Sequence, residues 1–285
     1  MTEKRINRRS AIVYSALLPE KLDDGIASGA DIVVLDLEDG TAPDRKAEGR
    51  EKVRPAFARD PGRPMQKMLR INNPRTADGM RDMLAILDWE TPPDALLLPK
   101  VEQPDEVRLV ADLLAPVHPQ IEFMLIMETP LALENIYALT AAAPQVKAVL
   151  LGCDDFSGAL GSDRAWDALA YARGRVVAAC AAAGIDAMDG PFYDPDDEAG
   201  LVAELGRVAS MGFTGKASYH AKQIPHIHAA FTPTPEQIAQ AHRILDALAG
   251  NKVGIAQLDG RMINAAIAKG AKRVLAIAEK RGVLR

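Results

Sequence analysis

Acidic side chains follow three apolar runs of strand length in this chain of 285 residues. The three runs lie within 31–41, at Ile121–Met127 and at Val146–Leu151. The carboxylates at their ends are Asp36, Glu38, Asp39, Glu128, Asp154 and Asp155. Carboxylates crowded at a strand's end repel one another, so they face water, a cation or a bound ligand. The pattern predicts one acidic, metal-binding mouth.

Glu128 and Asp155 are the predicted metal ligands. Carboxylate oxygens with no His or Cys nearby in the pattern suit Mg²⁺, with Mn²⁺ as the second choice, rather than zinc. Two carboxylates leave coordination positions for water and for an oxygen-rich substrate. The alternative is that these acids only cap helices or form ion pairs. Asp154 is adjacent and should point elsewhere.

Two cations follow other strand-like runs. Arg70 stands in Leu69–Asn72, where its guanidinium could grip a substrate carboxylate in two-pronged fashion, form a salt bridge with the acidic mouth, or both. Lys100 ends another run and could act as a Schiff-base lysine. Neighbouring acids would keep it charged, so an ion pair is favoured. The candidate partners are Glu102, Glu38 and Asp36.

Other chemistry-bearing residues are weaker candidates. His220 follows the last strand-like run and is either an acid–base group or a structural residue. His228 is expected in a loop or on a helix surface. Ser10 and Cys153 have no nearby base in the sequence, so they are poor candidates for a nucleophile.

Strand-like and helix-like segments alternate along the chain. The expected strands lie near Ala11–Tyr14, Ile32–Leu35, Lys67–Ile71, Ala95–Leu98, Glu122–Met127, Ala148–Leu151, Ile185–Met188 and Thr214–Ala217. Eight units with one rhythm favour a (β/α)8 barrel in residues 1–230, with a doubly wound open sheet as the alternative. Residues 231–285 form a helical extension that packs on its own barrel or on a neighbouring subunit.

Composition excludes several classes of partner. The formal charge of −5, without a basic stripe, argues against nucleic acid or an anionic membrane. No apolar run has transmembrane length, and the basic start has no apolar segment typical of a signal peptide. The two cysteines show no metal or redox spacing. These features fit the cytoplasm.

The order and spacing of short motifs resemble one superfamily over nearly the whole chain. The motifs are Arg9-Ser10, Asp36–Asp39, Lys46 with Arg50, Arg70–Asn72, Pro99–Glu102, Glu128-Thr129, Gly152–Asp155, Gly215-Lys216 with His220 and Gln223, Asp259-Gly260 and Met262-Ile263. The chain resembles the HpcH/HpaI aldolase and citrate lyase superfamily. Within it, the branch like the citrate lyase β-subunit includes malyl-CoA and citramalyl-CoA lyases.

The resemblance implies a TIM barrel with Mg²⁺ on Glu128 and Asp155. It implies that Arg70 holds the substrate near the metal and that Glu38 and Asp39 orient metal-bound water. It also implies a C-terminal helix that lends residues to a neighbour's site, hence a homo-oligomer, often a trimer. The usual chemistry is reversible cleavage of a 3-hydroxyacyl-CoA into acetyl-CoA and a 2-keto acid.

Three positions depart from the family pattern. Leu18 stands where a basic residue normally lies near the CoA phosphates, so Lys21 or Arg9 would have to substitute. Tyr219 and Ala221 flank His220 where the family has Ile-His-Pro. Asn264 replaces the Asp that is expected to exchange a proton at the acetyl carbon, and an amide cannot do so at neutral pH.

These observations predict a Mg²⁺-dependent carbon–carbon lyase acting on a short 3-hydroxyacyl-CoA of the citramalyl-, malyl- or citryl-CoA type. The expected catalytic residues are Arg70, Glu38, Asp39 and Asn264, and the expected substrate-binding residues are Arg70, Arg9 and Lys100. One rival is a CoA-independent aldolase on hydroxy-keto acids, which Leu18 favours. The other is a weak or non-catalytic homologue that binds Mg²⁺ and a keto acid, which Asn264 favours.

Overall fold

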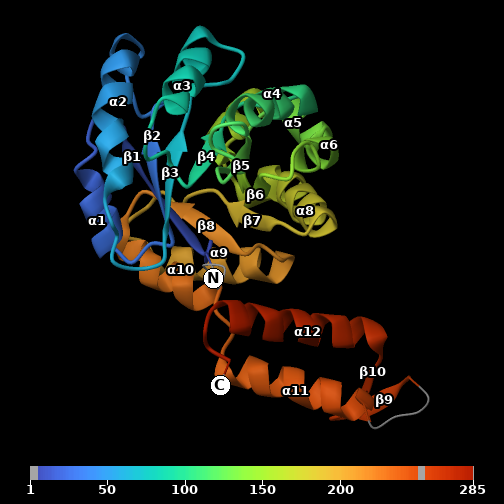
Figure 1. Ribbon diagram of the computed structural model, residues 1–285. Helices are drawn as coiled ribbons and strands as arrows, with labels where there is room; N and C mark the ends of the chain where they lie inside the picture. Colours follow the sequence, from blue (N-terminus) through green and yellow to red (C-terminus); the bar gives the residue numbers. More distant parts are fainter. Residues whose placement is uncertain (1–5, 250–253, 285) are drawn as a thin grey trace.

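A closed barrel of eight parallel strands forms the centre of the computed structural model, which describes residues 6–249 and 254–284 (Figure 1). The strands are β1 (Ser10–Ser15), β2 (Ile32–Asp36), β3 (Gln66–Arg70), β4 (Ala95–Leu98), β5 (Glu122–Met127), β6 (Val146–Leu151), β7 (Asp186–Asp189) and β8 (Gly215–Ser218). Each strand pairs with the next, and β1 also pairs with β8 through the register Ala11↔Ala217. This closure confirms the predicted (β/α)8 barrel over the open sheet.

Helical segments connect the strands and cover the outside of the barrel (Figure 1). They are α1 (Lys21–Ala27), η1 (Pro43–Arg45), α2 (Lys46–Val53), η2 (Arg54–Ala58), α3 (Ala77–Leu87), α4 (Pro104–Leu114), α5 (Pro130–Glu134), α6 (Ile136–Thr140), α7 (Cys153–Leu160), α8 (Trp166–Ala183), α9 (Glu198–Met211), η3 (Ala221–Gln223) and α10 (Ile224–Ala230). Among the described helices, none is long and apolar enough to cross a membrane.

Two apolar layers result from the alternation of side chains along each strand. One side of the strands fills the barrel interior, with Val34, Met68, Leu97 and Met124 among its buried members. The other side packs against the helices. Because both faces are covered, β2, β4, β5 and β6 are mainly apolar, which is why they are visible in the sequence, whereas β7 and β8 also carry buried charges at Asp189 and Lys216.

A polar plug closes the amino-terminal end of the barrel. Arg8 donates to Gln66 Oε1 at 3.2 Å and to Asp186 Oδ2 at 3.2 Å, and it also pairs with Glu122. These groups precede or begin their strands. The opposite, carboxyl end is therefore the end where polar loops remain for chemistry.

The extension consists of two long antiparallel helices and a small hairpin (Figure 1). Its elements are α11 (Pro235–Ala249), β9 (Ala256–Leu258), β10 (Arg261–Ile263) and α12 (Ala265–Lys280). Thr234 and Gln237 form a capping pair at the start of α11, because each side chain accepts the other residue's backbone N–H. The break after α10 falls at 231–234, where the domain boundary is predicted.

The end of α12 anchors the extension to the amino-terminal end of the barrel. Lys280 Nζ lies 3.1 Å from Asp186 Oδ2, and Arg281 donates to the carbonyl oxygen of Thr214. Met262 lies in β10, and α12 starts three residues later. Asn264 is the N-cap of α12. Its side chain accepts the Ile267 N–H, and this hydrogen bond fixes the first turn of the helix.

His228 contacts Ser10 beneath the barrel, which corrects the expectation of a surface histidine. Its Nε2 lies 2.7 Å from Ser10 Oγ and 3.7 Å from Asp31 Oδ1, whose carboxylate pairs with Arg9. Ser10 is fully buried, so this contact serves packing rather than catalysis. Burial, helped by Arg9 and other nearby guanidinium groups and opposed by Asp31, lowers the pKa of His228 to about 4.

This lowered pKa predicts a stability loss in mild acid. The unfolded chain binds a proton at His228 below about pH 6.5, whereas the folded protein does so only near pH 4. Stability should fall between these values, by at most roughly 3 kcal/mol. Urea unfolding of His228→Gln should show a correspondingly shallower pH slope. His226→Gln is the matched control and should keep the wild-type slope; equal slopes for all three proteins would contradict the account.

Candidate active site

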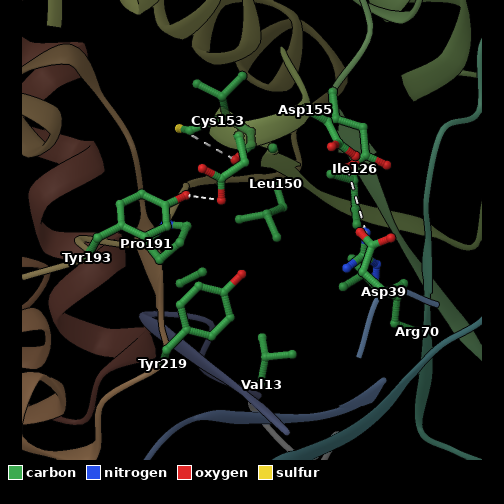
Figure 2. Close-up of a pocket in the computed structure, with 16 residues that line it drawn as sticks. Val13, Asp39, Arg70, Ile126, Leu150, Cys153, Asp155, Pro191, Tyr193 and Tyr219 are labelled. Carbon is green, nitrogen blue, oxygen red and sulfur yellow. Dashed lines mark hydrogen bonds and ion pairs between the residues drawn. The ribbon is translucent and has the colours of Figure 1, made fainter. Parts of the chain in front are cut away.

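A cavity opens at the carboxyl ends of the strands (Figure 2). Its floor is the top of the barrel interior, and its walls come from the loops after the strands. The lining residues are Val13, Asp39, Arg70, Leu97, Ile126, Glu128, Leu150, Leu151, Gly152, Cys153, Asp154, Asp155, Pro191, Tyr193, Ala217 and Tyr219. One side is charged and the floor is apolar, as expected for a small-molecule site.

Arg70 is the centre of the charged side. In the β2–β3 register it stands directly beside Asp36, so the strand pairing itself brings the two charges together. Its guanidinium contacts four carboxylates. Nη1 is 3.4 Å from Asp36 Oδ2, and Nη2 is 3.0 Å from Asp39 Oδ2 and 3.8 Å from Glu128 Oε2. Nη2 also pairs closely with Glu38. The predicted salt bridge of Arg70 with the acidic mouth is confirmed.

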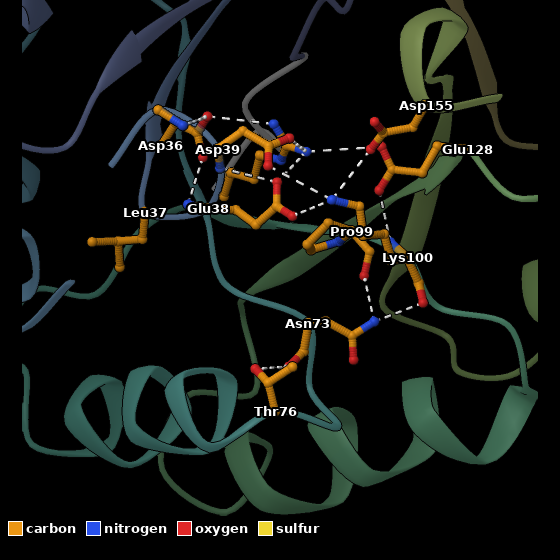
Figure 3. Close-up of polar contacts among 12 residues, drawn as sticks. Asp36, Leu37, Glu38, Asp39, Asn73, Thr76, Pro99, Lys100, Glu128 and Asp155 are labelled. Atoms are coloured by element: carbon orange, nitrogen blue, oxygen red, sulfur yellow. Dashed lines mark hydrogen bonds and ion pairs between the residues drawn. The ribbon is translucent and has the colours of Figure 1, made fainter. Parts of the chain in front are cut away.

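Lys100 is the second cation of the cluster (Figure 3). Its Nζ lies 2.6 Å from Glu38 Oε1, 3.2 Å from Asp155 Oδ2 and 3.6 Å from Asp39 Oδ1. The favoured ion pair is thus confirmed with Glu38. The surrounding carboxylates outweigh burial and raise the pKa of Lys100. It stays protonated, which excludes a Schiff-base nucleophile at neutral pH.

The other two partners considered for Lys100 are engaged elsewhere. Asp36 accepts the backbone N–H groups of Glu38 and Gly40, at 2.7 and 2.9 Å, besides contacting Arg70. It therefore fixes the acidic turn rather than pointing into the cavity. Glu102 pairs with Arg75 at 3.2 Å.

Lys100 has a left-handed backbone, with φ of 53°. That conformation is costly for a side chain with a Cβ and is found where surrounding contacts enforce it. Its N–H donates to Glu128 Oε1 at 2.8 Å, and its carbonyl oxygen accepts Asn73 Nδ2 at 2.7 Å. These bonds aim the Lys100 backbone at Glu128 and orient that carboxylate (Figure 3).

Glu128 is buried, with 3% of its surface exposed. Burial raises the pKa of Glu128 to about 8; Arg70 lowers it in part, and the Glu38 and Asp155 carboxylates raise it further. Burial likewise raises the pKa of Glu38 against the pull of Arg70. The two cations compensate the crowded acids only in part, so the cluster retains an attraction for another cation.

The donor set fits a small hard cation. Glu128 and Asp155 offer oxygens alone, and buried Asp155 Oδ2 has its ion pair with Lys100, at 3.2 Å, but no well-aligned hydrogen bond. Within residues 6–249 and 254–284, no three His, Cys, Asp or Glu side chains are grouped to hold a metal. Two carboxylates with remaining positions for water and substrate are characteristic of Mg²⁺ sites rather than zinc sites. Asp154 also lines the cavity, but its carboxylate contacts Tyr193 and Arg164 rather than the Arg70 cluster, as expected.

Two expected site residues, Arg9 and Asn264, lie away from the cavity. Glu38 and Lys100 do not line it either, but they contact Arg70 and Asp155, which do. Arg9 precedes β1 and pairs with Asp31 at 2.8 Å, at the amino-terminal end of the barrel. This position corrects the prediction that Arg9 binds substrate, because a six-residue strand separates it from the mouth. Asn264 lies at the start of α12, far along the extension from the anchor at Asp186 (Figure 1).

The contacts of His220 favour a structural role over an acid–base role. Its backbone N–H donates to Ser218 Oγ at 3.0 Å, and the ring does not line the cavity. Sequence reasoning missed Tyr193 and the contribution of Asn73. Tyr219 was noted only as a departure from a motif, and nothing in the pattern placed its ring in the cavity.

The chain belongs to the HpcH/HpaI aldolase/citrate lyase family, whose model matches residues 13–221. It is 30% identical to an L-malyl-CoA/beta-methylmalyl-CoA lyase of Cereibacter sphaeroides over 92% of this chain and 91% of that protein. It is 31% identical to the mitochondrial citramalyl-CoA lyase of Mus musculus over 95% of this chain and 86% of that protein.

Solved structures show the same relationship. CitE of Mycobacterium tuberculosis, in complex with magnesium, acetoacetate and coenzyme A, superimposes with a TM-score of 0.80 at 28% identity. That comparison covers 96% of this chain and 99% of the other. A citrate lyase of Burkholderia xenovorans, with a TM-score of 0.84 at 23% identity, supports the fold alone.

Gly152 allows Glu128 its position, which gives a prediction. A Cβ at Gly152 would lie 2.5 Å from Glu128 Cβ and 2.9 Å from Ile126 Cγ2, whereas a Cβ at Gly158 would meet nothing within 4 Å. Gly152→Ala should lower the free energy of unfolding in urea by about 2 kcal/mol and shift Glu128 in a crystal structure. Gly158→Ala, inside the helix α7 that Gly152 precedes, should be neutral or stabilising. Equal stability of the two variants would contradict this packing.

Proposed function

We propose that this chain is a Mg²⁺-dependent carbon–carbon lyase that cleaves a short 3-hydroxyacyl-CoA to acetyl-CoA and a 2-keto acid. Substrates of the malyl- and citramalyl-CoA type match the activities in the relatives' names, and citryl-CoA is the third candidate. The observation that carries the proposal is the arrangement of Arg70 beside Glu128 and Asp155. A guanidinium next to a two-carboxylate cation site suits a ligand that carries both a carboxylate and a hydroxyl or keto oxygen.

The acidic residues would bind the metal and its water, and the basic residues would bind the anionic substrate. Glu128 and Asp155 would hold Mg²⁺, which when bound polarises the oxygen that changes from hydroxyl to keto. Arg70 binds the substrate carboxylate and stabilises negative charge as the carbon–carbon bond breaks. Glu38 and Asp39 orient water around the cation. Lys100 lies within reach of the same anionic ligand and would balance its charge.

Binding of the CoA moiety depends on the loop after β1. Leu18 is exposed in that loop and cannot bind phosphate. Of the two cations expected to substitute, only Lys21 follows β1 on the side of the mouth, where it pairs with Asp24 at 2.7 Å. Lys21 is therefore the phosphate-binding candidate in this chain, at the cost of its surface ion pair.

A CoA-independent aldolase is the second candidate, and Leu18 is the observation in its favour. Incubation with Mg²⁺ and two substrate sets separates the candidates by mass spectrometry of the products. One set contains malyl-, citramalyl- and citryl-CoA, and the other contains free 4-hydroxy-2-keto acids. Acetyl-CoA formation that EDTA abolishes supports the lyase. Cleavage of the second set alone supports the aldolase, and silence in both supports a weak keto-acid-binding homologue.

The extension favours a homo-oligomer, with a trimer as the expected form. Asn264 lies on an arm anchored at the amino-terminal end of the barrel, so it lies far from its own cavity. A neighbour's cavity is the site that it would reach. The cytoplasm stays a prediction, and the mouse relative is named as mitochondrial.

The metal assignment predicts a contrast between two adjacent acids. Asp155→Asn should weaken Mg²⁺ binding, measured by isothermal titration calorimetry, by at least about tenfold, or about 1.4 kcal/mol. Asp154→Asn should bind Mg²⁺ as the wild type does, because Asp154 pairs with Arg164 and Tyr193 instead. Equal loss in both variants would show that overall negative charge, rather than ligation by Asp155, attracts the cation.

The amide at position 264 predicts a gain of function. Asn264→Asp adds a proton-exchanging group of the same shape, so kcat for CoA-thioester cleavage should rise by about tenfold. Glu128→Ala is the companion variant and should abolish activity by removing a metal ligand. A flat response to Asn264→Asp, with activity abolished in Glu128→Ala, would show that Asn264 does not limit turnover.

A further inference from the structure

Two tyrosines form the wall of the cavity that lies opposite the Arg70 cluster (Figure 2). Tyr193 comes from the loop after β7, and Tyr219 directly follows β8. Their ring centroids are 6.3 Å apart, with an angle of 45° between the planes. The residues proposed to bind Mg²⁺ and the substrate carboxylate all lie on the charged side, and none of them belongs to this wall.

The proposed cleavage requires a proton donor in this cavity. When the carbon–carbon bond breaks, the electron pair goes to the acetyl carbon, which must then take a proton. Asn264 cannot supply it. Among the lining residues, three carry a neutral proton-bearing heteroatom in the side chain, namely Cys153, Tyr193 and Tyr219.

The four acidic residues that line the cavity have other partners or roles. Asp39 pairs with Arg70, and Asp154 pairs with Arg164. Glu128 and Asp155 are the proposed metal ligands, and carboxylates that ligate a metal are ionised. None of the four is therefore a proton donor to carbon while the metal is bound.

Cys153 and Tyr193 are also unsuitable. Cys153 is buried, and its Sγ lies 3.9 Å from the carbonyl oxygen of Leu151. The Tyr193 hydroxyl donates to Asp154 Oδ2 at 2.5 Å, and the Arg164 guanidinium stacks 4.0 Å from the centre of the Tyr193 ring. Its proton is thus held between two heteroatoms on the cavity wall.

Tyr219 differs from both. In the part of the chain that the structure describes, its hydroxyl has no hydrogen-bond partner, and 47% of the residue is exposed. Figure 2 shows the hydroxyl directed into the cavity, beside Leu150 and Val13. Burial of the ring raises the pKa of Tyr219, although Arg70 lowers it in part, so the phenol is protonated at neutral pH.

We propose that Tyr219 is a catalytic residue that donates its phenolic proton to the acetyl carbon; this inference rests on the proposed lyase function. The bond between the hydroxyl-bearing carbon and the acetyl carbon breaks as the hydroxyl oxygen becomes the keto oxygen. The phenolic O–H bond then breaks, and a C–H bond forms on the acetyl carbon. The hydroxyl proton leaves to solvent, and the phenolate regains a proton from solvent, so protons and electrons balance.

The test compares Tyr219→Phe with Tyr171→Phe, a control that removes a phenol from the exposed surface of α8. Tyr219→Phe should lower kcat for CoA-thioester cleavage by at least about 100-fold, with KM changed by less than about threefold. A second readout is exchange of the acetyl-CoA methyl protons in D2O, measured by mass spectrometry with Mg²⁺ and oxalate, which cannot accept a carbanion. Exchange should be lost in Tyr219→Phe and kept in Tyr171→Phe.

Each outcome separates this inference from the function on which it rests. If the wild type cleaves and Tyr219→Phe keeps both kcat and exchange within about threefold, Tyr219 is not the donor although the lyase function stands. If the wild type exchanges methyl protons through Tyr219 without cleaving any thioester, the donor stands and the lyase function fails. If the wild type does neither, both are overturned.

Discussion

The rest of this active site depends on the guanidinium of Arg70, which compensates the negative charge of the carboxylates around it. Arg70 contacts Asp36, Glu38, Asp39 and Glu128, which come from two different strand ends. Without a cation among them, these partly buried carboxylates would repel one another and become protonated instead. The β2–β3 register places Asp36 beside Arg70, so the strand pairing also supplies the positive charge that keeps the carboxylates of the mouth ionised. The raised pKa of Arg70 follows from the same carboxylates, which outweigh its burial.

The arrangement around Arg70 leaves the opposite side of the cavity free for different chemistry. Lys100 has an unfavourable, left-handed backbone conformation. In this conformation its N–H donates to Glu128 and its side chain pairs with Glu38. These contacts hold the charged wall in place. Within residues 6–249 and 254–284, the wall formed by Tyr193 and Tyr219 carries no such network around the Tyr219 hydroxyl. In the mechanism that we propose, one side would bind and polarise a ligand, while the other would exchange a proton with it.

The sequence predicts the barrel well because most of its strands, such as β2, β4, β5 and β6, are buried on both faces and are mainly apolar. Arg70 and Lys100 were visible for the same reason, as charges at the ends of apolar runs. Tyr219 was not, since an aromatic residue in a loop reveals neither its direction nor its neighbours. Arg9 was misplaced because a motif in a family pattern does not show at which end of a strand the side chain lies. His228 was misread because its partner, Ser10, is 218 positions away.

The most direct test of the account is anomalous diffraction from crystals grown with Mn²⁺ and a 2-keto acid such as pyruvate. The account predicts a peak about 2.1 Å from one oxygen each of Glu128 and Asp155, with the keto-acid carboxylate bonded to Arg70. Asp155 would then exchange its contact with Lys100 for the metal. A peak ligated by other residues, or no peak while Lys100 still contacts Asp155, would contradict the assignment of the metal site.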